Sequence, residues 1–322
     1  MKSKKLSIGC EFANNKLTQQ LYGPNNCHLD RIESTLGVSL HTKGNQITIK
    51  GSAAQSIIAE KSLKSLYTLL ESGEKIDMGD IDGSIRLAQS HYKAKSTPEN
   101  LKIETGKKHI RPRSHGQAKL FTALKEFAMV FALGPAGTGK TYIAVAKAVE
   151  LKLAGKVDKI ILSRPAVEAG ERLGFLPGDM KDKIDPYLRP LYDALYDMLP
   201  GDTVLKFLES GEIEVAPIAF MRGRTLANSF VILDEAQNTT AVQMKMFLTR
   251  MGDNSRMVIT GDQSQVDLPF GVHSGLQEAV TILGNLKGIG NISLNETDVV
   301  RHPLVSRIVA AYEAFDKSRA KI

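Results

Sequence analysis

Apolar residues recur at two different spacings in the N-terminal part of this 322-residue chain. Helical spacing predicts helices over 28–36 and 53–71, and short apolar runs predict strands over 38–43 and 46–51. Two helices with a hairpin between them are typical of a small α+β domain. We therefore expect one such domain over residues 1–72.

The following stretch, residues 73–110, holds few large apolar residues. A helix is expected around 81–92, and the rest is polar and rich in lysine and arginine. Composition of this kind favours a linker or an arm rather than a packed domain. The sequence thus predicts a basic linker over residues 73–110.

The pattern changes over residues 111–322, where strands and helices alternate. The strands are continuous apolar runs, which indicates burial on both faces of a sheet. Strands are expected at 127–133, 159–163, 212–217, 230–234, 256–260 and 291–295, and helices at 140–154, near 187–199 and at 303–317. This alternation predicts an α/β domain with a mainly parallel sheet covered by helices.

Positive charge is concentrated towards the N-terminus. Residues 1–116 hold 18 basic and 11 acidic side chains, whereas residues 117–322 hold 24 of each. This asymmetry favours a polyanionic partner for the N-terminal third, or a basic linker. The alternative is a basic surface that serves solubility alone.

Composition excludes several other protein classes. With 42% hydrophobic and 24% charged residues, the chain has the balance of a globular protein and not of a disordered or fibrous one. No apolar run is long enough to span a membrane, and none follows the basic N-terminal residues. The two cysteines and seven histidines show no spacing typical of a disulfide or zinc site. We expect a cytoplasmic protein without a membrane partner.

One segment carries a specific signature for phosphate binding. Between an expected strand and an expected helix, the chain matches G-x-x-x-x-G-K-[ST]. The match consists of Gly134, Pro135, Ala136, Gly137, Thr138, Gly139, Lys140 and Thr141. Glycines allow successive backbone N–H groups to point at phosphate oxygens at a helix N-terminus. This P-loop predicts an ATP site in which Lys140 reaches the β- and γ-phosphates and Thr141 ligates Mg²⁺.

A pair of carboxylates follows the apolar run at 230–233. Asp234, at the carboxyl end of the expected strand, is predicted to hold Mg²⁺, and Glu235 to orient and polarise the attacking water. Many strands end in acidic turns, so the pair gains its weight from the P-loop upstream. We assign catalytic roles to Lys140, Asp234 and Glu235.

Three further residues are candidates, each with an alternative. Gln265, after the strand at 256–260, is predicted to sense the γ-phosphate, with a strand-ending turn as the alternative. Arg301 is a candidate arginine finger or a surface residue. Gln117, ahead of the first strand, either reads the adenine edge or is an exposed helix-start residue.

A long loop-rich stretch follows Ser163-Arg164-Pro165, after the second expected strand of the sheet. Because it leaves the carboxyl end of a strand, it is a candidate for contact with a nucleic-acid strand or a neighbouring subunit. The alternative is a structural insertion.

These segments together resemble the PhoH-like ATPases. The resemblance spans about residues 110–318 and rests on the P-loop and on the sequences at 163–195, 231–240, 259–269 and 299–305. It implies a RecA-like core of the kind found in superfamily 1 helicases, with ATP and Mg²⁺ as ligands. Gln265 falls in a GDxxQ pattern similar to helicase motif III, Gln117 where an adenine-reading glutamine is expected, and Arg301 where the family has a late arginine.

Residues 8–72 resemble the KH-like N-terminal region of bacterial PhoH-like proteins of the YbeZ type. A KH domain clamps the RNA backbone with a GXXG loop. The corresponding loop here, Gly23-Pro24-Asn25-Asn26, lacks the second glycine. The resemblance implies a role in RNA metabolism, with single-stranded RNA and an endoribonuclease of the YbeY type as partners.

The length of the chain bears on Arg301. Residues 117–322 suffice for one RecA-like core, whereas superfamily 1 helicases carry the arginine finger on a second core. Arg301 then acts in its own subunit or at the nucleotide of a neighbour. The second arrangement requires a homo-oligomer, and the resemblance favours a hexameric ring.

Three functions follow from these observations. The first is an RNA-stimulated ATPase, a helicase-like remodeller that works with an endoribonuclease. The second is an ATP-gated module that recruits a nuclease with little turnover. The third is a small-molecule kinase, which the carboxylate pair disfavours because it points to water as the nucleophile.

Overall fold

The computed structural model describes residues 5–93, 101–165, 180–300, 304–305, 307–308 and 311–312. The chain divides into two compact units. The first consists of Met1–Asn100 with Pro112–Ala118, and the second of Leu101–Arg111 with Lys119–Ile322. The division therefore falls inside helix α5 (His115–Glu126).

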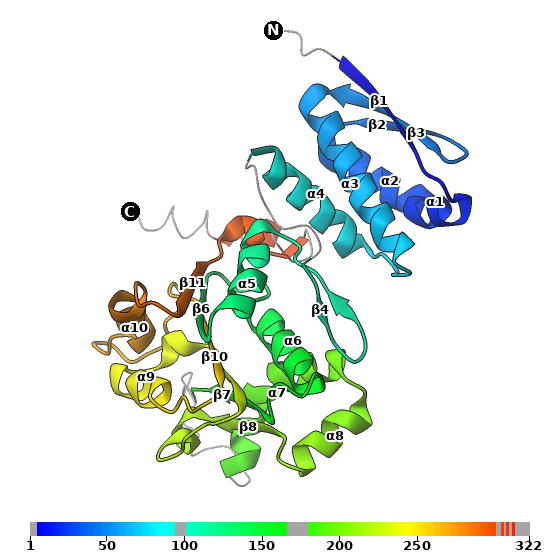
Figure 1. Cartoon of the computed structure of the whole chain (residues 1–322). Coiled ribbons are helices and arrows are strands. Elements are labelled where there is room, and N and C mark those ends of the chain that lie inside the picture. The colour runs from blue at the N-terminus through cyan, green and yellow to red at the C-terminus, as the bar shows by residue number, and fades with distance from the viewer. Residues whose placement is uncertain are drawn as a thin grey trace, which may run out of the picture. The chain divides into compact units, whose positions relative to one another are not determined.

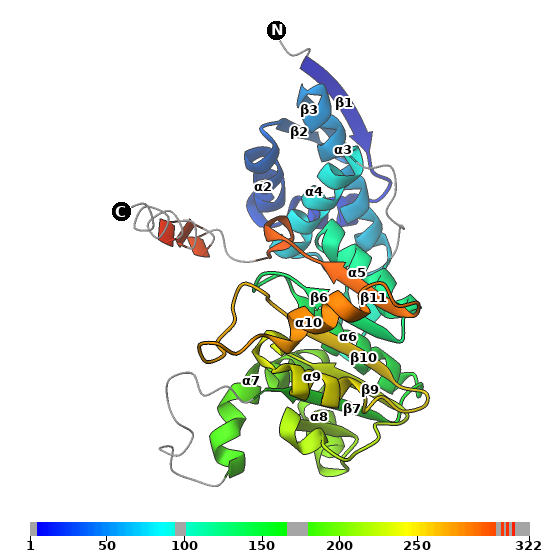
Figure 2. The same ribbon diagram turned by 90° about the vertical axis from the view of Figure 1, so that its left-hand side faces the viewer.

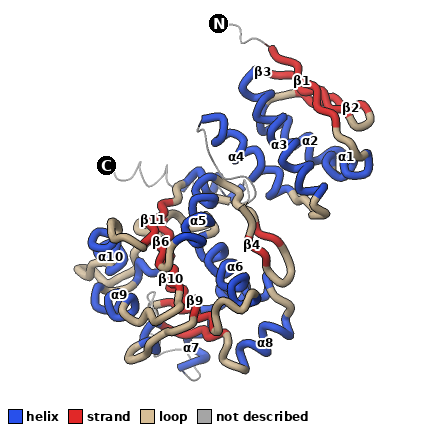
Figure 3. Tube along the Cα trace, viewed as in Figure 1, coloured by secondary structure: helices blue, strands red, loops and turns tan. Residues whose placement is uncertain are grey.

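The first unit is a three-stranded antiparallel sheet with helices packed on one face (Figure 3). Its elements are β1 (Lys5–Glu11), α1 (Asn15–Tyr22), the 3-10 turn η1 (Pro24–Asn26), α2 (Cys27–Leu36), β2 (Ser39–Lys43), β3 (Gln46–Ser52), α3 (Ala53–Glu71) and α4 (Met78–Lys93). The strands lie in the order β1-β3-β2. The loop that the resemblance equates with a GXXG loop connects α1 to α2.

The core of this unit lies between the sheet and its helices. Alternation along β3 buries Ile47 and Ile49 and leaves Lys50 exposed, as expected for a strand covered on one face. The opposite side of the core comes from the apolar stripes of α2 and α3, which include Ile32 and Leu63. The two helices and two strands predicted here are confirmed, but the pattern of apolar residues did not predict β1 and α1.

Within the predicted linker, the helix expected around 81–92 is confirmed, but the expectation that this stretch lies outside the packed domain is wrong. Within residues 73–110 the structure contains α4 and a short hairpin, β4 (Ile103–Glu104) with β5 (His109–Ile110). Ile81, Ile85 and Ala88 of α4 are buried in the core of the first unit. Their helical spacing outweighs the polar composition around them, so the first unit extends beyond residue 72.

The second unit contains a six-stranded sheet in which every pair of neighbours is parallel. Its strands are β6 (Met129–Leu133), β7 (Lys159–Arg164), β8 (Ile213–Pro217), β9 (Ser229–Leu233), β10 (Arg256–Gly261) and β11 (Ile289–Ser293). Its helices after α5 are α6 (Lys140–Leu153), α7 (Met180–Met198), α8 (Gly201–Glu209), α9 (Ala241–Leu248) and α10 (Gly275–Leu283). Short 3-10 turns lie at η3 (Ile218–Met221), η4 (Ala236–Asn238) and η5 (Glu296–Asp298). This confirms the predicted α/β fold with a parallel sheet.

Helices cover both faces of this sheet (Figures 1 and 2), and an apolar core lies between the helices and each face. Alternate residues of each central strand point to opposite faces, so Phe230 and Ile232 of β9 enter one core and Val231 and Leu233 the other. The first core is completed by α5, α6, α7 and α8, and the second by α9 and α10. Burial on both faces explains why these strands are continuous apolar runs.

The strand order brings together the carboxyl ends of the strands that carry the predicted site residues. The order is β11-β6-β10-β9-β7-β8, so β10 lies between the strand before the P-loop and the strand before Asp234. Parallel strands present their carboxyl ends at one edge, where α/β proteins bind ligands. The ends of β6, β10, β9 and β7 all meet there.

Two predicted features fall largely outside the described residues. They are the helix expected at 303–317 and the first part of the stretch after Pro165, of which 166–179 are not described. Among the helices that the structure describes, none combines the length and the apolar character needed to cross a membrane.

Candidate nucleotide site

The P-loop links β6 to α6 through two glycines in a left-handed conformation. Gly137 and Gly139 have φ angles of 81° and 80°, a region that glycine adopts without strain. Gly139 is the N-cap of α6 and makes no side-chain cap bond to its first turn. An uncapped helix N-terminus behind a left-handed glycine turn is suited to bind a phosphate.

Gly134 is required where the loop begins. Its φ angle is 140°, and a β-carbon there would lie 2.4 Å from the backbone oxygen of Leu294. The Gly134 N–H donates to the carbonyl of Gly261 at 3.1 Å, which ties the loop to the end of β10. On its outer side, the carbonyl of Gly137 accepts from the N–H of Val300 at 2.9 Å. The loop is thus fixed between its neighbours.

The Lys140 side chain folds back over this loop. Its Nζ donates to the carbonyls of Gly134 and Pro135 at 2.6 and 2.8 Å, and the Thr138 hydroxyl donates to Pro135 at 2.8 Å. Burial lowers the pKa of Lys140, while nearby carboxylates, Asp262 first, oppose that shift. An ammonium group held beside a phosphate-binding loop is well placed to receive an anion.

Asp234 is held by two threonine hydroxyls. Thr141 Oγ1 and Thr260 Oγ1 each donate to Asp234 Oδ1 at 2.6 Å. The Asp234 N–H donates to the carbonyl of Ser163 on β7 at 2.8 Å. A hydroxyl that gives its proton to a carboxylate turns its lone pairs outward, and oxygen ligands of this kind suit Mg²⁺. The donor set of Thr141 and Asp234 fits that ion.

Glu235 lies one residue further, in a left-handed backbone conformation (φ 51°, ψ 40°). Such a conformation costs a non-glycine residue about 1–3 kcal/mol and clusters at functional sites. Both carboxylate oxygens are bonded: Oε1 to Arg164 Nη2 at 2.8 Å, and Oε2 to Gln237 Nε2 at 2.6 Å. The other amide atom of Gln237, Oε1, accepts from the N–H of Asp262 at 3.0 Å.

Asp262 contributes a third carboxylate from the end of β10. Ser264 donates to its Oδ1 through both the backbone N–H and the hydroxyl, at 2.9 and 2.6 Å. Its Oδ2 is buried and has no hydrogen-bond partner in the structure. A buried, unpartnered carboxylate oxygen is costly, which indicates a cationic or donating ligand at this point.

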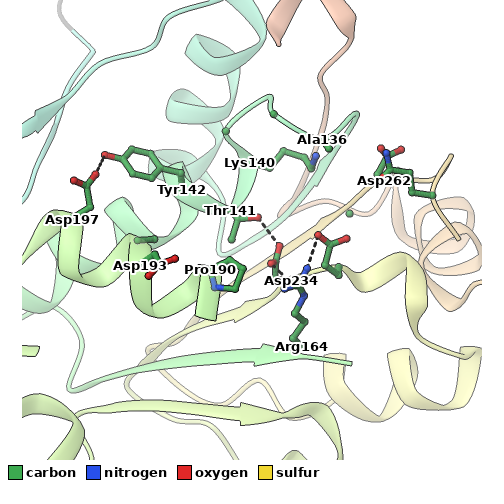
Figure 4. Close-up of a pocket in the computed structure, with 16 residues that line it drawn as sticks. Ala136, Lys140, Thr141, Tyr142, Arg164, Pro190, Asp193, Asp197, Asp234 and Asp262 are labelled. Carbon is green, nitrogen blue, oxygen red and sulfur yellow. Dashed lines mark hydrogen bonds and ion pairs between the residues drawn. The ribbon is translucent and has the colours of Figure 1, made fainter. Parts of the chain in front are cut away.

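These groups line one cavity of about 600 Å³ (Figure 4). Its floor comes from the P-loop and the strand ends, and its far wall from α7, through Pro190, Asp193 and Asp197. Tyr142 of α6 donates to Asp197 at 2.7 Å, which joins the two helices. A cavity of this size accommodates a small organic ligand with its phosphates.

The structure brings most of the predicted residues together. Eight of the predicted residues line the cavity: Ala136, Gly137, Gly139, Lys140, Thr141, Asp234, Glu235 and Gln265. Gly134, Pro135 and Thr138 form the loop behind them. Gln117 lies in the first compact unit, where its Oε1 accepts from the N–H of Arg113 at 2.7 Å. Arg301 lies outside the described residues, so its role stays a prediction.

Sequence reasoning missed three residues that hold the carboxylates. Thr260 bonds to Asp234, Gln237 to Glu235, and Arg164 lies against both carboxylates. Arg164 and Thr260 could not be assigned without the strand order, which puts the ends of β7 and β10 on either side of the end of β9. The sequence does show a polar residue at the end of each of these predicted strands, and this pattern could have indicated them as candidates.

Comparison with known proteins gives consistent matches. The family profile described as PhoH-like protein matches residues 109–313. A PhoH-like protein of Bacillus subtilis (strain 168) is 48% identical over 311 residues, which cover 96% of this chain and 98% of that protein. One of Mycobacterium tuberculosis (strain ATCC 25618 / H37Rv) is 48% identical over 299 residues, 92% and 85% of the two chains. This chain belongs to the PhoH-like family.

The match extends beyond the nucleotide site. Protein PhoH of Escherichia coli (strain K12) is 46% identical over 206 residues, which cover 63% of this PhoH-like chain and 58% of that protein. The match to the Bacillus protein spans nearly all of both chains, so both compact units of this PhoH-like chain have counterparts there. The P-loop core of this family is the domain that carries the cavity.

Proposed function

We propose that this PhoH-like chain binds ATP with Mg²⁺ in the cavity and hydrolyses it. The observation that carries the proposal is the hydrogen bond from Thr141 to Asp234, in the same cavity as Lys140 and Glu235. A P-loop threonine joined to a strand-end aspartate is the arrangement that P-loop NTPases use for the metal of their nucleotide.

The chain's own groups have distinct tasks in this proposal. The N–H groups of Gly137 and Gly139 and the start of α6 bind phosphate oxygens, and Lys140 neutralises the β- and γ-phosphates. Mg²⁺, held through Thr141 and Asp234, supplies charge neutralisation at the transferred phosphate. Glu235 orients the attacking water and accepts its proton.

Three further residues have roles in this proposal. Gln265, which lines the cavity after β10, senses the γ-phosphate. Arg301 neutralises charge in the transition state, in its own subunit or in a neighbour within a hexameric ring. Gln117 reads the adenine edge. These three assignments rest on the family resemblance and on position in the chain.

RNA is the proposed partner that couples to turnover. The excess of basic residues over residues 1–116 supports a polyanionic ligand, and the first compact unit presents a Gly-Pro-Asn-Asn loop between two helices. The family resemblance favours single-stranded RNA and an endoribonuclease of the YbeY type. The protein then acts as an RNA-stimulated ATPase that remodels RNA for a nuclease.

The test is steady-state phosphate release by the full-length protein with and without single-stranded RNA. We expect RNA to raise turnover, and Glu235→Gln to abolish turnover under both conditions. Equal turnover with and without RNA would contradict the coupling of RNA binding to hydrolysis and would favour an ATP-gated binding module. A phosphorylated metabolite in place of free phosphate would favour a kinase.

A further inference from the structure

Arg164 is the last residue of β7, and its side chain reaches the two carboxylates that end β9. Its Nη2 lies 2.8 Å from Glu235 Oε1, and its Nε lies 3.9 Å from Asp234 Oδ2. The side chain is 21% exposed and lines the cavity. A guanidinium held this way by two partly buried carboxylates forms a strong, charge-assisted contact.

The direction of this contact matters for Glu235. In the sheet, β7 lies on one side of β9, whereas β10 and the P-loop strand β6 lie on the other. In the close-up, Arg164 and Lys140 lie on opposite sides of Asp234 (Figure 4). The ion pair therefore ties Oε1 of Glu235 to the residue that ends β7, and this oxygen does not accept a proton from water while the pair is closed.

The second oxygen of Glu235 is also restrained. Gln237 bonds to Oε2 at 2.6 Å and is itself fixed by the N–H of Asp262. A carboxylate that accepts a hydrogen bond from a guanidinium on one oxygen and from an amide on the other has both oxygens bonded to protein groups. To accept a proton from water beside the γ-phosphate, Glu235 must give up at least one of them.

We propose that Arg164 is a positioning residue that holds Glu235 away from the attacking water until the ion pair opens. This inference rests on the proposed ATP hydrolysis and adds a restraint on its rate. Opening of the pair frees Glu235 to bond to water, so the strength of the Arg164–Glu235 contact sets the basal turnover. Nucleotide binding itself does not depend on Arg164, because the P-loop and Lys140 bind the phosphates.

The test compares basal phosphate release, at saturating ATP and Mg²⁺ and without RNA, between wild type and Arg164→Ala. We expect kcat to rise about tenfold, equivalent to ~1.4 kcal/mol, while the dissociation constant for ATP changes less than about twofold. Arg164→Lys keeps a charge but offers a single donating centre, so its kcat should lie between the two. Damage to the fold would lower kcat instead.

Two controls assign the effect to this contact. The double variant Arg164→Ala/Glu235→Gln should show no turnover, which attributes the rise to Glu235. Arg224→Ala is the matched control. It removes another Arg–Glu ion pair of the same unit, in which Arg224 lies 2.6 Å from Glu214, and neither residue lines the cavity. Its basal kcat should equal that of wild type, and thermal unfolding of each variant reports on folding.

The outcomes separate this inference from the proposed function. A basal kcat for Arg164→Ala and Arg164→Lys at or below the wild-type value would overturn the restraint. If wild-type turnover still requires Glu235 in that case, the proposed hydrolysis stands without it. If neither the wild type with RNA nor Arg164→Ala releases phosphate in a Glu235-dependent way, the proposed function itself fails.

Discussion

The Thr141 hydroxyl donates a 2.6 Å hydrogen bond to Asp234 across a sequence separation of 93 residues. This contact joins the first turn of α6 to the end of β9, two strands away from the P-loop strand in the sheet. Thr260 of the intervening strand donates to the same oxygen. The proposed metal site is thus assembled from three neighbouring parts of one sheet edge before a nucleotide binds.

Substitution of Thr141 tests the metal site. Thr141→Ser keeps the hydroxyl and should retain turnover within about threefold, whereas Thr141→Val keeps the shape and removes the oxygen. For Thr141→Val we expect a loss in kcat of about 100-fold or more, on the order of what removing one preorganised polar group from an active site costs. Turnover measured across a Mg²⁺ titration checks this, because the valine variant should also need more Mg²⁺. Equal Mg²⁺ dependence in both variants would count against the assignment.

The backbone of the P-loop gives a second prediction. Gly134→Ala places a β-carbon 2.4 Å from the Leu294 carbonyl oxygen, at a φ angle of 140°. We expect it to lower the free energy of unfolding by about 3 kcal/mol or more and to abolish ATP binding. Gly155→Ala is the matched control, since Gly155 also has a positive φ, 64°, but no atom within 4 Å of the new β-carbon.

Gly155→Ala should cost about 1 kcal/mol from backbone strain alone and leave ATP binding intact. Urea unfolding and titration with a fluorescent ATP analogue measure both quantities. If the two alanine variants behave alike, the close approach to Leu294 is not what requires a glycine at residue 134.

A pH dependence is expected from Arg224 and Glu214. The hydrogen bonds from Arg224 lower the pKa of Glu214, against the opposing effect of burial. Because the pKa is lower in the folded protein, the pair contributes stability above the unfolded-state pKa and loses it as pH falls through the folded-state pKa. The side chains are 35% and 29% exposed, so solvent limits the contribution to about 0–1 kcal/mol.

The measurement is urea unfolding of wild type and Arg224→Ala between about pH 7 and about pH 4. The variant should be less stable by up to about 1 kcal/mol at neutral pH, and the difference should shrink towards acid. A difference that stays constant over this range would mean that the Glu214 charge does not carry it.

Local patterns were sufficient for much of the fold and part of the site. The P-loop is a contiguous motif, so Gly134 to Thr141 could be assigned without knowledge of the sheet. The strands of the parallel sheet are continuous apolar runs, and each observed strand overlaps its predicted run. Asp234 and Glu235 follow directly from the end of such a run.

Features that depend on strand order were not predictable from one sequence. Arg164 and Thr260 reach Asp234 only because β7 and β10 flank β9. In the first unit, β1 and α1 lie in a polar stretch with few apolar residues, and α4, although expected as a helix, was not expected to pack into the core. In each case tertiary packing selects a structure that local composition does not favour.

In the proposed mechanism, Glu235 activates water for hydrolysis of ATP bound at the P-loop. Single-turnover cleavage of γ-labelled ATP by wild type and Glu235→Gln, with the dissociation constant for ATP measured for both, tests it most directly. We expect Glu235→Gln to bind ATP within about threefold of wild type and to cleave it at least about 100-fold more slowly. Cleavage by Glu235→Gln at the wild-type rate would contradict this role of Glu235.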